Sequence, residues 1–110
     1  NGEDAAVDPL AARLRSRANG RTEPIAEIDL YIGERYEAAG QMRLALAAYR
    51  RANRIAESRR SLEAVARASN ATGDTIAAIL AYRTLCRKNG GSGPACASAR
   101  ELEGNAEPAP

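Results

Sequence analysis

Apolar residues recur at intervals of three and four through the middle of this chain, the spacing that places them on one face of an α-helix. We expect four helices there, at about 24–39, 41–56, 59–72 and 75–88. Residues suited to turns and N-caps separate them, namely Gly40, Ser58 and the pair Gly73-Asp74. The pattern predicts an all-α protein built from two antiparallel helical hairpins.

Shorter helices are predicted at both ends of this region. Asp8-Pro9 can start one at about 9–18, and Pro94 opens another at about 94–103, after a glycine-rich loop. The domain therefore spans 9–103. We expect the small, polar ends, 1–8 and 104–110, to be disordered tails.

Small, aromatic and turn residues recur 33 positions apart in the two hairpins. The first set is Ile32, Gly33, Tyr36, Gly40, Ala45, Tyr49 and Ala52. The second set is Val65, Ala66, Ser69, Gly73, Ala78, Tyr82 and Leu85. This pattern resembles the tetratricopeptide repeat, which implies a short α-α solenoid with repeats at about 24–57 and 58–90, closed by 94–103 as a capping helix.

Two features of this pattern predict close helix packing. Gly33 lies within an apolar stripe, where glycine costs about 1 kcal/mol of helix propensity, so we expect a neighbouring helix to approach it closely, with Ala45 as its counterpart. Tyr49 and Tyr82 are expected to occupy equivalent slots between helices.

The composition limits the chemistry that the chain can perform. It has 110 residues, no histidine and two cysteines, so the commonest general base is absent and a structural zinc site is excluded. Glu34 and Glu37 could share a helix face, but such a pair is usually solvated surface. No phosphate-binding loop is recognisable. We therefore expect no enzyme activity and no cofactor or metal.

The resemblance implies that a ligand would lie in a concave groove formed by the first helix of each hairpin. The corresponding outward positions are Leu30, Glu34, Glu37, Glu63, Arg67 and Asn70. Their mixed, partly acidic character favours a basic or helical segment of another protein. The alternative is that these are simply exposed polar residues.

Arginines form a second candidate surface on the helix at 41–56. Arg43, Arg50 and Arg54 are spaced seven and four residues apart, which aligns them as one basic stripe on the convex side. This stripe could meet phosphates or acidic protein, or be solvated surface. We expect no nucleic-acid binding, because no aromatic residue is interleaved for base stacking and the net charge is only +2.

Two functions follow from these observations. The first is a protein-interaction scaffold or adaptor, such as part of an envelope or secretion assembly. The alternative is a self-assembling structural protein, in which the acidic helix of one copy meets the basic helix of the next, head to tail. No apolar run approaches the roughly 20 residues that span a bilayer, so membrane insertion is not expected.

Cys86 and Cys96 lie on either side of the glycine-rich loop, one near a helix end and one near the next helix start. Antiparallel helices joined by a short loop can bring them within disulfide distance. A bridge implies an oxidising compartment, such as the bacterial periplasm or another exported location. Two free thiols in a cytoplasmic protein are the alternative.

Overall fold

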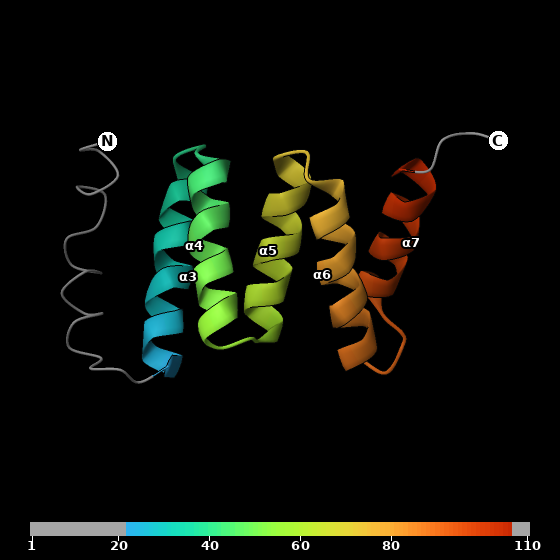
Figure 1. Ribbon diagram of the computed structural model, residues 1–110, viewed down its shortest axis with the longest axis horizontal. Helices are drawn as coiled ribbons and strands as arrows, with labels where there is room; N and C mark the ends of the chain where they lie inside the picture. The colour runs from blue at the N-terminus through green and yellow to red at the C-terminus, as the bar shows by residue number, and fades with distance from the viewer. Residues whose placement is uncertain (1–21, 107–110) are drawn as a thin grey trace.

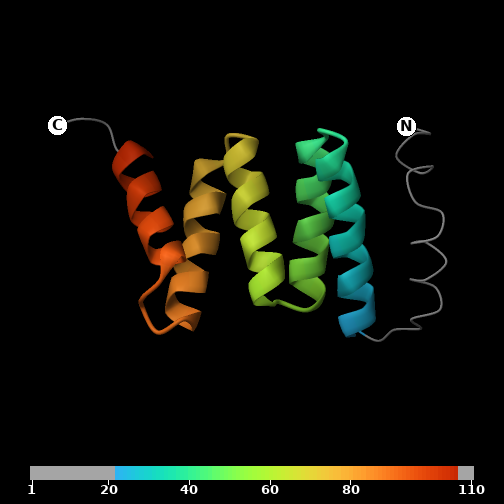
Figure 2. The ribbon, with the colours of Figure 1, turned by 180° about the vertical axis from the view of Figure 1, so that it is seen from behind.

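The computed structural model describes residues 22–106, and every regular element in this range is an α-helix. The helices are α3 (Thr22–Ala38), α4 (Met42–Ile55), α5 (Arg59–Ala71), α6 (Thr75–Lys88) and α7 (Pro94–Ala106). They stand side by side in chain order, each running opposite to the one before it (Figure 1). The same order is seen from behind (Figure 2). The predicted all-α class is confirmed.

The predicted helix boundaries agree with the structure to within about two residues, with one exception. α7 continues to Ala106, whereas the sequence predicted its end near 103 and a disordered tail from Gly104. Glu103 is held by Arg83 of α6 at 2.6 and 3.0 Å, which anchors the last turns of α7 despite the glycine. The helix predicted at 9–18 and the tails at 1–8 and 107–110 lie outside the described residues.

Both hairpin turns have the same hydrogen-bond pattern. Gly40 and Gly73 adopt φ of 77° and 87°, a region that glycine enters without steric cost. The next residue then donates its amide to a carbonyl five residues earlier, Gln41 to Tyr36 and Asp74 to Ser69, each at 2.9 Å. This pattern closes the end of a helix. The repeated glycines therefore mark equivalent turns.

The predicted N-caps of α5 and α6 are confirmed. The Ser58 hydroxyl accepts from the Ser61 amide at 3.0 Å, and the Ser61 hydroxyl accepts from the Ser58 amide at 2.9 Å, a reciprocal capping box. Asp74 accepts from the Ala77 amide at 3.1 Å. These contacts satisfy amides that the first turn of a helix leaves unpaired.

The core is a thin layer of mostly small side chains between successive helices. On α4, the residues Ala45, Ala48, Tyr49 and Ala52 are completely buried. Except for Ala48, these residues belong to one cluster with alanines of α5, including Ala64 and Ala68. Because alanine fills little volume, the few larger residues carry much of the packing.

Because Gly33 has no side chain, it leaves room for the Tyr49 ring in this core. A methyl group added at Gly33 would lie 2.5 Å from Cδ1 and 3.0 Å from Cζ of the Tyr49 ring. The predicted close approach is therefore confirmed, but the group that fills the space is the Tyr49 ring rather than Ala45. Glycine is required here because the ring lies against the backbone of α3.

The structure predicts that Gly33→Ala destabilises the protein by about 1 to 3 kcal/mol, the usual cost of overpacking a core. Alanine would otherwise gain about 1 kcal/mol of helix propensity. With Tyr49→Ala as background the clash is absent, so the same substitution should stabilise. Urea unfolding of the two single variants and the double variant measures this reversal of sign, and stabilisation in the wild-type background would contradict it.

The second hairpin, α5 and α6, differs from the first, α3 and α4, at the equivalent position. Ala66 stands 33 residues after Gly33 and is fully buried, so the second hairpin accommodates a methyl group where the first requires glycine. Tyr82 is only partly buried, whereas Tyr49 is completely buried. We expected the two tyrosines to occupy equivalent slots between helices. This prediction is wrong, because the two side chains differ in how deeply they are buried.

Candidate functional site

Ion pairs connect α3 to α5 on the face where the sequence analysis expected a groove. Arg60 bonds to Glu27 at 2.8 Å and to Glu34 at 3.0 Å. Arg67 bonds to both carboxylate oxygens of Glu37, at 2.8 and 2.9 Å. These glutamates of α3 are therefore engaged within the chain by arginines of α5. The Arg60 pairs are half exposed, so each contributes at most about 1 kcal/mol.

Glu37 contacts both Arg67 of α5 and Tyr49 of α4. It accepts from the Tyr49 hydroxyl at 2.6 Å, and the Arg67 guanidinium lies 5.8 Å from the centre of the Tyr49 ring. The hydrogen bond from Arg67 lowers the pKa of Glu37, and the bond from Tyr49 adds to this, against the opposing effect of burial. Burial, reinforced by the neighbouring carboxylate, raises the pKa of Tyr49. Glu37 is thus an ionised side chain that connects the exposed Arg67 to the buried Tyr49.

Of the three remaining residues predicted to line the groove, one is buried and two are exposed. Leu30 is buried, with 2% of its surface exposed, in the same cluster as Ala26 and Ala68, so its prediction as an outward residue is wrong. The buried face of α3 includes Ala26, Leu30 and Gly33, whereas Ile25 and Ile32 of the apolar stripe are only partly buried. Glu63 and Asn70 are exposed on α5, as predicted.

The arginine stripe on α4 borders the turn between α5 and α6. Arg50 bonds to Asp74 at 3.2 Å, and Arg43 and Arg50 both line a hollow of about 320 Å³ beside Thr72. Arg43 and Arg54 are exposed. One member of the stripe is therefore already paired within the chain, and whether the stripe takes a ligand stays a prediction.

A cavity of about 220 Å³ opens where α5 begins, α6 ends and α7 begins, at the lower end of these helices in Figure 1. Its lining combines charged and apolar side chains. The lining residues are Arg59, Glu63, Leu85, Lys88, Asn89, Pro94 and Ala95. Pockets for whole small molecules usually measure about 300 to 1,000 Å³. This cavity is the size of one or two amino-acid side chains.

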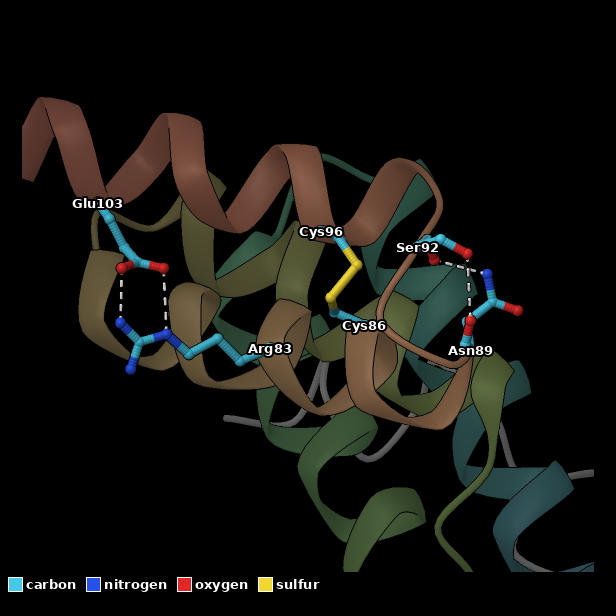
Figure 3. Close-up of a disulfide and its surroundings, with 6 residues drawn as sticks. All are labelled: Arg83, Cys86, Asn89, Ser92, Cys96 and Glu103. Atoms are coloured by element: carbon cyan, nitrogen blue, oxygen red, sulfur yellow. Dashed lines mark hydrogen bonds and ion pairs between the residues drawn. A yellow bond between two sulfur atoms is a disulfide. The ribbon is translucent and has the colours of Figure 1, made fainter.

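Polar contacts around the cavity fix its walls. Lys88 bonds to Glu57 at 3.1 Å, which ties the end of α6 to the segment between α4 and α5. The Asn89 amide donates to the Ser92 carbonyl at 2.7 Å, within the loop that leads to α7 (Figure 3). The positions of Lys88 and Asn89 are therefore set by contacts outside the cavity itself.

A disulfide joins Cys86 to Cys96 (Figure 3). The two cysteines adjoin Leu85 and Ala95 of the cavity lining in the sequence. The Cα atoms are 4.8 Å apart and the cysteines are separated by 10 residues. The predicted bridge is thus present. It holds the first turn of α7 against the last turn of α6, and so keeps Pro94 and Ala95 opposite Leu85.

Sequence reasoning missed several residues of this surface. Arg59, Lys88 and Asn89 come from two helix ends that no local pattern connects, although Glu63 was predicted. It also missed that Ile76 and Leu80 of α6 are exposed, at 69% and 57%. A signal was available, because apolar residues at 76, 79, 80, 82 and 85 cover more than one face of a helix.

Residues 22–106 contain no group of three or more histidine, cysteine, aspartate or glutamate side chains placed to hold a metal ion. Within the same range, no helix combines the length and the apolar character needed to cross a membrane. Comparison of the chain with protein-family models, curated proteins and solved structures gave no match. Inferences about function therefore depend on the chain's own residues.

Proposed function

We propose that this chain is a tetratricopeptide-like scaffold domain that binds a segment of another protein. The segment would lie along the face formed by α3, α5 and α7, with one or two of its side chains in the cavity between α5 and α7. The observation that carries the proposal is this cavity, which has side-chain size and is lined by side chains of both charges together with apolar ones. Few convergent polar groups around an apolar space are typical of binding sites.

The charges of this face indicate the chemistry of the segment. Glu27, Glu34 and Glu37 are neutralised by arginines of α5, so they attract a partner only weakly. Glu63 has no such partner among the described residues and stands at the cavity, next to Arg59. A segment that offers a basic residue to Glu63 and an apolar side chain to Leu85 fits this arrangement.

Selection of peptides from a random library displayed on phage, using the full chain as bait, tests the proposal. Selected peptides should bind Glu63→Arg at least about tenfold more weakly than wild type, because the reversed charge repels the basic residue. Arg54→Glu is the matched control, a charge reversal at another exposed position, on α4, and should leave affinity unchanged. Equal binding to wild type and Glu63→Arg, measured by fluorescence anisotropy, would reject the site.

The disulfide supports an exported location, such as the bacterial periplasm, for this scaffold. Structural disulfides persist in oxidising compartments and are rare in the cytosol. An exported interaction domain of this kind fits an envelope or secretion assembly. Alkylation of freshly purified, unreduced protein followed by mass spectrometry tests the premise, since two alkylated cysteines would remove the argument for export.

Head-to-tail self-assembly through acidic and basic helices is less well supported. The acidic residues Glu27 and Glu34, which that hypothesis pairs with arginines of the next copy, are paired with Arg60 of the same copy. Sedimentation at two salt concentrations distinguishes the two functions, because association driven by charge weakens as ionic strength rises.

A further inference from the structure

The outer face of α6 exposes two large apolar side chains that nothing in the described structure covers. Ile76 is 69% exposed and Leu80 57% exposed, and they lie one helical turn apart. The other large apolar residue exposed among residues 22–106 is Tyr31, which has the Arg35 guanidinium 5.9 Å from its ring centre. The α6 pair is therefore the main uncovered apolar surface of this part of the chain.

In the first hairpin, the equivalent face of α4 has the second hairpin packed beside it. The positions 33 residues before Ile76, Leu80 and Arg83 are Arg43, Ala47 and Arg50 on α4. Those three line the hollow against Thr72 and Asp74, at the start of α6, and Arg50 bonds to Asp74. This face of α4 thus lies beside the N-terminus of α6, the helix that is equivalent to α4 in the second hairpin.

No corresponding helix lies beside α6 within residues 22–106. α7 follows α6 as α5 follows α4, and its buried Ala99 stands 33 residues after the buried Ala66. At the positions where α4 has arginine and alanine, α6 has isoleucine and leucine. The stacking interface between hairpins thus continues at α6 as an apolar face against which no helix of residues 22–106 packs.

The charges around this face are basic. α6 contains Arg83, Arg87 and Lys88 and no acidic residue between Thr75 and its end. Arg83 is paired with Glu103, and Lys88 with Glu57. Arg87 donates to the Thr84 hydroxyl at 3.3 Å and has no carboxylate partner among the described residues. Arg87 lies on the same stripe as Ile76 and Leu80, seven residues beyond Leu80, so an acidic group suits this surface.

We propose that the Ile76–Leu80 face of α6 is a second docking surface, which takes an amphipathic helix of another protein with acidic residues in its first turns. The apolar stripe of that helix covers Ile76 and Leu80. Its acidic residues approach Arg87, which has no carboxylate partner among the described residues. This surface lies on a different helix face from the α5–α7 cavity and operates independently of it.

A library of amphipathic helices about five turns long tests this inference. The apolar stripe is fixed, and all remaining positions are randomised between glutamate and lysine. Selection on the wild-type chain should enrich glutamate in the first turns. Selected helices should bind Ile76→Arg/Leu80→Ala at least about tenfold more weakly, measured by fluorescence anisotropy. That variant places on α6 the residues that α4 has at these positions, so it should remain folded.

Glu63→Arg is the control that separates this surface from the cavity, and it should bind the selected helices as tightly as wild type. The inference is overturned if no helix is enriched, if lysine-rich helices are enriched equally, or if binding survives in the double variant. It is also overturned if sedimentation shows a wild-type dimer that the double variant abolishes, since a second copy would then be the occupant.

Discussion

Replacing Tyr49 with alanine is expected to lower the free energy of unfolding by about 3 to 5 kcal/mol, the usual cost of deleting a large buried aromatic side chain. Tyr49 is completely buried, its ring lies against the Gly33 backbone, and its hydroxyl donates to Glu37 at 2.6 Å. In a core made mainly of alanine, few neighbouring side chains can move in to fill the resulting cavity. The loss should therefore lie toward the upper end of this range.

Tyr49→Phe separates the ring from its hydroxyl. It keeps the packing against Gly33 but leaves Glu37 with Arg67 alone, so we expect a loss of only about 1 kcal/mol. Urea unfolding followed by far-UV circular dichroism measures both variants under the same conditions. A loss below about 1 kcal/mol for Tyr49→Ala would show that the side chain is exposed in solution, contrary to the structure.

Features that depend on neighbouring residues could be predicted from the sequence. Gly40 and Gly73 marked the turns because a positive φ there suits glycine, and Ser58 and Asp74 marked helix starts because their side chains accept from amides three residues on. Each of these contacts spans five residues or fewer, so its signature is contiguous in the chain. The helix boundaries followed from them.

Features that depend on distant residues were less predictable. The sequence indicated that something approaches Gly33, but the choice between Ala45 and the Tyr49 ring depends on how α3 and α4 are rotated against each other. Leu30 belongs to the same class, since its burial depends on the wider packing of α3. Periodicity identifies a helix face, whereas the angular width of the buried face is set by its neighbours.

The candidate site shows the same division. Glu63 was predicted from its helix position, but Arg59, Lys88 and Asn89 join it only when the ends of α5 and α6 meet the start of α7. The pairing of Arg60 with Glu27 also links residues 33 apart in the chain. A sequence shows that both charges exist, but only the fold shows that they neutralise each other rather than attract a partner.

Removing the disulfide with Cys86→Ala/Cys96→Ala is expected to cost about 2 to 3 kcal/mol, because the crosslink restricts a short loop of the unfolded chain. The bond joins residues separated by 10 positions and fixes the start of α7. α7 packs against α6 but has no further helix beyond it in the described structure, so most of the loss should appear as local opening of α7. Alanine is the replacement of choice because Cys96 is buried, and a serine hydroxyl there would need a partner.

Amide hydrogen exchange measured by residue tests this localisation, since exchange in α7 should accelerate much more than exchange in α4. Reduction of the wild-type protein should reproduce the pattern without any substitution. Glu103→Gln is the control, since it removes the exposed ion pair with Arg83 but keeps the crosslink, and it should lower protection only in the last turns of α7. If α7 retained its protection after loss of the disulfide, then packing of Leu85 and Ala99 would suffice to hold it, and the cavity at the start of α7 would keep its shape in a reducing compartment as well.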